Sequence, residues 1–86
     1  MNEEYEGLRK KLVLMKVVIE AECFDLARYW LGKINTNFGE LEIAKQAHVT
    51  IKLLLKDRNY DLALWAIDEM LEEIENIESM GELLSE

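Results

Sequence analysis

Apolar residues recur at steps of three and four along most of the chain, which is the spacing of one face of an α-helix. The first such run predicts a helix over residues 3–20. Its members are Tyr5, Leu8, Leu12, Met15 and Ile19. Val13, Val17 and Val18 widen the same stripe, so we expect them to contribute to the buried face of this helix.

Two further runs with this spacing predict helices over residues 24–34 and 38–56. The segment between their apolar runs, residues 35–39, reads Asn-Thr-Asn-Phe-Gly, a composition typical of a loop. Asn37 stands three residues before Glu40, which is the spacing of a capping box. We therefore expect a loop to separate the second helix from the third.

The last periodic run is the longest, and it predicts a helix from about residue 60 to Met80. Asn59 ends the preceding break and is a favourable N-cap for this helix. Gly81 follows the last periodic residues, and glycine commonly terminates helices. We expect the helix to stop at this glycine.

Four predicted helices place the chain in the all-α class, as two antiparallel helical hairpins. Hairpin 1 covers about residues 3–34 and hairpin 2 about residues 38–80, and the 86 residues form a single domain. The chain has no proline and four glycines, which argues against the many turns of a β-sandwich or barrel. Both a closed four-helix bundle and a fragment of an open α–α superhelix fit this pattern.

A shift of 36 residues partly superimposes the chain on itself. Phe24-Asp25-Leu26-Ala27 then aligns with Tyr60-Asp61-Leu62-Ala63, Tyr29 aligns with Trp65, and Val17-Val18-Ile19 aligns with Leu53-Leu54-Leu55. Each unit consists of a helix, a short break and a second helix that opens with aromatic-Asp-Leu-Ala. The small alanine lets the two helices of a hairpin approach closely.

These units resemble the helical hairpins of the tetratricopeptide (TPR) family, whose second helix commonly opens with a small polar residue, an aromatic residue and, three positions later, alanine. Residues 59–63, Asn-Tyr-Asp-Leu-Ala, follow this order, and the resemblance covers about residues 12–35 and 48–71. It implies a TPR-like α–α superhelix fragment. Met15 and Ile51 stand where the family has a small residue, and the family's closing proline is missing from both units. The resemblance therefore does not extend to the family's peptide-binding groove.

Two repeat units are few for a helical array, because such arrays bury their apolar faces by stacking several units. We therefore expect a homodimer. Tyr29 and Trp30 are consecutive and cannot both face one core, so at least one of them should lie at the surface or in an interface. Together with Trp65 they are candidate apolar anchors for a protein partner, a role to which tryptophan and tyrosine are well suited.

The net charge of −8 is confined to the last third of the chain. Residues 1–58 contain ten basic and nine acidic residues, whereas residues 59–86 contain nine acidic residues and no basic one. The plain interpretation is a soluble acidic face that also attracts the basic residues near the start. The functional interpretation is a docking face for a basic protein partner. Its candidate residues are Asp68, Glu69, Glu72 and Glu73.

Residues suited to catalysis or metal binding are scarce. His48 is the only histidine, aligns with Leu12 in the repeat and is expected to be partly buried. Cys23 is the only cysteine, which excludes an internal disulfide and a multi-cysteine zinc site, and acidic neighbours disfavour its thiolate. Phosphate-binding glycine loops and nucleophile-elbow motifs are missing as well. We therefore expect no enzymatic activity, catalytic residue, cofactor or metal.

The longest apolar run, residues 62–67, has six residues and is too short to span a bilayer. The first five residues are acidic rather than signal-like. These features predict a cytoplasmic protein without membrane contact, and the negative charge disfavours direct nucleic-acid binding. We expect a small protein–protein interaction module, adaptor or regulatory subunit that binds through helix faces. The alternative is an acidic inhibitor or antitoxin-like protein that masks the surface of a nucleic-acid-binding partner.

Overall fold

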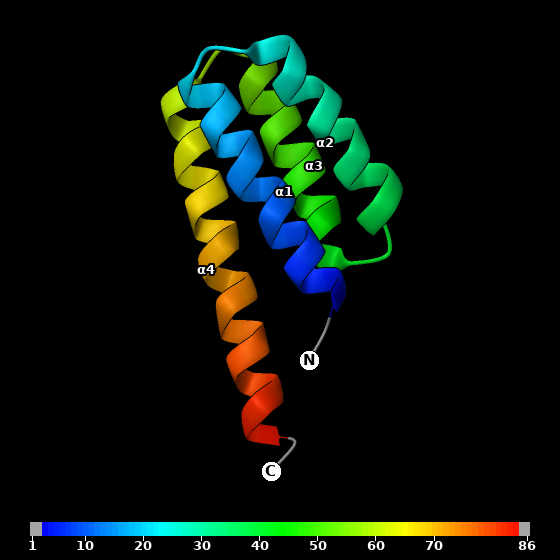
Figure 1. Ribbon diagram of the computed structural model, residues 1–86. Helices are drawn as coiled ribbons and strands as arrows, with labels where there is room; N and C mark the ends of the chain where they lie inside the picture. Colours follow the sequence, from blue (N-terminus) through cyan, green and yellow to red (C-terminus); the bar gives the residue numbers. More distant parts are fainter. Residues whose placement is uncertain (1–2, 85–86) are drawn as a thin grey trace.

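The computed structural model describes residues 3–84, which form four α-helices joined by short turns. The helices are α1 (Glu3–Glu20), α2 (Phe24–Phe38), α3 (Glu42–Lys56) and α4 (Tyr60–Leu84). They run in alternating directions, so α1–α2 and α3–α4 form two antiparallel hairpins whose turns lie at the same end of the molecule (Figure 1). The all-α fold with two hairpins is thus confirmed.

The four helices form a closed ring. α1 packs against α2 and α4, and α3 packs against the same two helices. An open superhelix would leave the first and last helices apart, so the contact between α1 and α4 gives a closed bundle. The C-terminal end of α4 projects beyond the other three helices (Figure 1).

One apolar core fills the centre of the ring, and every helix contributes one stripe to it. Its largest fully buried side chains are Leu8, Leu12, Met15, Ile34, Ile51, Ile67 and Ile74. Buried alanines, such as Ala27 and Ala63, let neighbouring helices approach closely. Within the described residues no polar or charged side chain is buried. Stability therefore comes from apolar burial, at about 1.5–3 kcal/mol for each large side chain.

The two hairpin turns share one backbone geometry. Glu22 and Arg58, 36 residues apart, have left-handed backbones with φ of 62° and 59°. In each turn this residue and the next donate their backbone N–H groups to helix carbonyls three and five residues earlier, which is a Schellman motif. Phe24 and Tyr60 open the following helices, and their rings stack with centroids 4.0 Å apart and planes at 10°. An aromatic contact therefore joins the two turns.

Asn59 caps α4 as predicted, because its Oδ1 accepts a hydrogen bond from the backbone N–H of Leu62 at 3.4 Å. The predicted end of α4 at Gly81 is wrong, since the helix continues to Leu84. A single glycine in a helix costs about 1 kcal/mol relative to alanine, which does not by itself end a helix. Hairpin 2 therefore extends beyond residue 80.

The loop predicted over residues 35–39 is also wrong, because α2 continues to Phe38. Phe38 follows Ile34 on the same helical stripe and packs against the core. Its ring lies so close to Gly7 of α1 that an added Cβ there would be 3.1 Å from it. This contact with another helix holds the last turn of α2 in place, and hairpin 1 reaches residue 38 instead of 34.

The start of α3 differs from the prediction for the same reason. The predicted capping box of Asn37 and Glu40 does not form, because α2 still includes Asn37. α3 begins at Glu42 rather than at residue 38, and Leu41 occupies its N-cap without a side-chain hydrogen bond. Hairpin 2 therefore starts four residues later than predicted.

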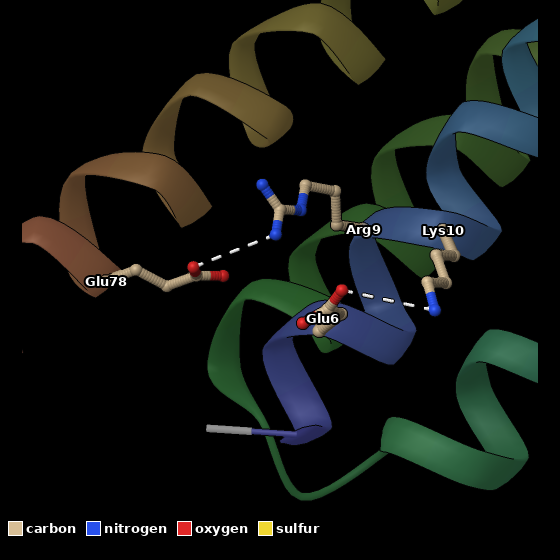
Figure 2. A network of polar contacts seen from close by, with 4 residues as sticks. All are labelled: Glu6, Arg9, Lys10 and Glu78. Carbon is tan, nitrogen blue, oxygen red and sulfur yellow. Dashed lines mark ion pairs between the residues drawn. The ribbon is translucent and has the colours of Figure 1, made fainter. Parts of the chain in front are cut away.

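Ion pairs cross the seam between α1 and α4. Arg9 on α1 approaches Glu78 on α4 at 3.8 Å, and Figure 2 shows its guanidinium reaching across to that helix. Lys16 Nζ donates a hydrogen bond to Asp68 Oδ1 at 2.8 Å. This hydrogen bond and the negative charge of Asp68 raise the pKa of Lys16 above its ordinary value. The acidic last helix is thus attached to basic residues near the start of the chain.

Replacing Glu22 by glycine is expected to stabilise the fold by about 0.5–1 kcal/mol. Glycine adopts the left-handed backbone without the Cβ clash, although it loses more chain entropy on folding. The matched control is Glu22→Ala, which removes the same side chain but keeps Cβ, so it should gain nothing. Urea unfolding measures both free energies. A glycine variant no more stable than the alanine variant would contradict a strained turn.

Candidate protein-interaction surface

A groove of about 330 Å³ lies between α3 and α4. We call it the α3–α4 groove. Trp65 and Met70 of α4 line it, together with Gln46 and Thr50 of α3. Trp65 is 58% exposed, whereas Met70 is half-buried and packs against the core. The groove therefore offers an accessible aromatic ring next to a flexible apolar side chain.

Three carboxylates also line the α3–α4 groove, from Glu69, Glu72 and Glu73 on α4. All three side chains are exposed, and no lysine, arginine or histidine is among the lining residues. Their charges are therefore not compensated by a basic group within the groove. A partner that brings positive charge and an apolar side chain would satisfy both features of this surface.

Four of the seven predicted interaction residues meet in this groove: Trp65, Glu69, Glu72 and Glu73. Asp68 does not join them, because it faces α1 and pairs with Lys16. Tyr29 and Trp30 lie on α2 in the other hairpin and are likewise separate from the groove. The structure therefore divides the predicted set between different sides of the bundle.

Tyr29 and Trp30 contact each other edge to face, with ring centroids 5.4 Å apart. Tyr29 is 55% exposed, and Trp30 is half-buried. Lysines of the same chain cover both rings, with Lys11 Nζ 4.1 Å from the Trp30 centroid and Lys33 Nζ 5.4 Å from that of Tyr29. These are cation–π contacts, so hairpin 1 supplies its own positive charge to its aromatic residues.

Hairpin 2 lacks the matching lysine. Trp65 is the equivalent of Tyr29 at the 36-residue shift, and Glu69 is the equivalent of Lys33. The aromatic ring therefore has a carboxylate four residues later in the helix, where its counterpart has an ammonium group. This exchange makes the two aromatic surfaces opposite in charge.

Sequence reasoning missed that both hairpins expose an equivalent apolar stripe. The stripe of hairpin 1 consists of Val13, Val17, Leu26 and Tyr29. The stripe of hairpin 2 consists of Val49, Leu53, Leu62 and Trp65, and all eight side chains are between 43% and 58% exposed. The prediction that Val13 and Val17 join the core is wrong, and of the three valines expected to widen the buried face of α1 only Val18 is buried. Each helix buries only the narrow face that lies between its two neighbours. Val13 and Val17 lie outside this face of α1 and are therefore exposed.

The two remaining candidate residues lie outside the α3–α4 groove. Cys23 is exposed in the turn between α1 and α2, and His48 is half-buried on α3. Among the described residues no group of three or more His, Cys, Asp or Glu side chains is placed to hold a metal ion. None of the helices in residues 3–84 is both long and apolar enough to cross a bilayer.

No protein-family model, curated protein or solved structure matches this chain. The resemblance to tetratricopeptide repeats therefore stays a prediction that rests on residues 59–63 and on the 36-residue alignment.

The two tryptophans are expected to respond oppositely to charged fluorescence quenchers. Trp65 lies beside carboxylates, which concentrate caesium and repel iodide, whereas Lys11 beside Trp30 attracts iodide. The measurement uses the single-tryptophan variants Trp30→Phe and Trp65→Phe at low ionic strength. Acrylamide, which is neutral, serves as the control for exposure and should quench Trp65 more strongly. The same caesium-to-iodide ratio for both tryptophans would contradict the described surface.

Proposed function

We propose that this chain is a small protein–protein interaction module, acting as an adaptor or regulatory subunit, that binds a basic partner through the α3–α4 groove. One observation carries the proposal: Trp65 and Met70 share a groove with Glu69, Glu72 and Glu73. Tryptophan is a frequent anchor of binding energy, and methionine adapts its shape to different partners.

The groove has the chemistry needed to receive an amphipathic basic helix. An apolar side chain of that helix would pack against Trp65 and Met70, which line the groove together. Its lysines or arginines would meet the three glutamates at the rim, and an arginine would also stack on the exposed indole. Opposite charges would speed association, while the apolar contact would supply most of the affinity.

The alternative is an acidic inhibitor that masks a nucleic-acid-binding surface. Such a mimic binds mainly through charge, so its affinity falls steeply as salt rises. An interaction anchored by Trp65 depends much less on salt. The exposed aromatic ring in the groove favours the interaction module over the mimic.

A basic amphipathic peptide made of leucine and lysine is expected to bind the full-length chain in calorimetry. Trp65→Ala should weaken binding at least about tenfold, because it removes the apolar anchor. Glu72→Gln should weaken binding less and reduce the salt dependence. The matched control is Glu75→Gln, an exposed glutamate of the same helix that does not line the groove. Equal effects of the two glutamine variants would overturn the proposed site.

The same titration separates the two candidate functions. If Trp65→Ala binds as the wild type does and affinity collapses with salt, the acidic mimic is the better description. If affinity survives in salt and depends on Trp65, the interaction module is supported.

We also propose that two copies of the chain associate through the exposed stripe of hairpin 1, because the stripe of hairpin 2 includes Trp65, which belongs to the α3–α4 groove. Light scattering at micromolar concentration should give the mass of a dimer, and Val17→Lys should give a monomer because it places charge in the stripe. The matched control is Leu53→Lys, the equivalent change on hairpin 2, which should leave the dimer intact. A monomeric mass for the wild type would overturn this proposal.

A further inference from the structure

A second cavity, of about 440 Å³, lies between α2 and α3. We call it the α2–α3 pocket. Its walls include the apolar side chains of Leu31 and Leu55, which also belong to the core. Gly32 lines it as well. The size lies in the range of small-molecule sites.

The α2–α3 pocket is basic, although the chain as a whole carries a net charge of −8. Its polar lining consists of Arg28, His48, Lys52, Lys56 and Arg58, and no carboxylate is among the lining residues. Only Arg28 is paired, with Asp25 at 3.1 Å. In the described part of the chain, Lys52, Lys56 and Arg58 have no ion-pair partner within 4.0 Å. Charges of one sign gathered in this way attract an anion.

The seam between α1 and α4 is the internal equivalent of this pocket and can be compared with it. The 36-residue shift that relates the hairpins maps the contact between α2 and α3 onto the seam between α4 and α1. Lys52 then corresponds to Lys16, and Gly32 corresponds to Asp68. At the seam, Lys16 Nζ donates to Asp68 Oδ1 at 2.8 Å. In the pocket the lysine is retained, but a glycine stands where the carboxylate would be.

The other pocket residues differ from their equivalents in the same direction. In place of Arg28, His48, Lys56 and Arg58, the seam has Leu64, Leu12, Glu20 and Glu22. Leu12 is fully buried, and Leu64 packs against the core, so apolar side chains occupy these places at the seam. One backbone arrangement therefore supports a lysine–carboxylate contact on one side and a basic pocket without a carboxylate on the other.

Neither packing nor backbone geometry requires a glycine at position 32. A Cβ added to Gly32 would meet nothing within 4 Å, and its φ is not positive. Glycine is also less favourable than alanine inside a helix. The effect of Gly32 is to leave open the space that Asp68 fills at the seam.

We propose that the α2–α3 pocket binds a small organic phosphate whose phosphoryl group takes the place that the Asp68 carboxylate has at the α1–α4 seam. Lys52 would contact the phosphoryl oxygens as Lys16 contacts Asp68. The arginines add planar donors that match phosphate geometry, and the lysine at position 56 adds charge. Leu31 and Leu55 would contact the apolar part of the ligand. This site is independent of the interaction proposed for the α3–α4 groove.

The test is a titration of the full-length, isotope-labelled chain with phenyl phosphate, followed by amide NMR at low ionic strength. The expected result is a saturable set of shifts confined to α2 and α3 around the pocket. Inorganic phosphate should move the same amides with at least about tenfold lower affinity, because it lacks the apolar group. Shifts that do not saturate, or that follow lysines over the whole surface, would overturn the proposal.

Two substitutions of Gly32 make the test specific. Gly32→Asp supplies the missing carboxylate and should weaken phenyl phosphate binding at least about tenfold, since it pairs with Lys52 and repels the ligand. Gly32→Ala fills little of the pocket and adds no charge, so affinity should stay within about twofold of the wild type. Thermal unfolding of each variant checks that it is folded. Unchanged binding by the aspartate variant would overturn the site.

Discussion

Burial of one apolar core by four short helices is the constraint on which this molecule depends. Because each helix contacts two neighbours in the ring, only a narrow stripe of each is buried, and no polar side chain in the described residues is buried with it. Buried alanines such as Ala27 and Ala63 allow the close spacing that seals the core. The surfaces outside these stripes are therefore left to differ between the two hairpins.

The two hairpins differ on their surfaces while sharing a common frame. Both have a left-handed residue in the turn, and an aromatic stack joins their ends. Outside the core, Lys33 of hairpin 1 is matched by Glu69 of hairpin 2, and Gly32 is matched by Asp68. Such single exchanges turn one fold into a carboxylate-lined groove, a paired seam and a basic pocket.

Sequence patterns predicted the helices and the hairpin turns, because apolar periodicity and capping by Asn59 are local properties. They failed at residues 35–38, where Asn and Thr suggest a loop but contact between Phe38 and Gly7 maintains the helix. Trp65 and the glutamates were candidate interaction residues because they follow one another along α4, but the sequence did not show that they share a groove with α3. The basic pocket was missed because its residues come from α2, from α3 and from the turn after α3, and the apolar pattern does not show that α2 packs beside α3. The 36-residue alignment held a signal for it, in the pairing of Gly32 with Asp68.

The charge pattern has a consequence for how the molecule meets others in solution. Basic side chains converge on the pocket between α2 and α3, whereas α4 exposes carboxylates and carries no basic residue. This separation gives the bundle a permanent electric dipole in addition to its net charge. In the field of a charged neighbour the molecule experiences a torque, so it rotates during diffusional encounter before any surface touches. Cations therefore approach α4 first, and small anions approach the side of the ring formed by α2 and α3.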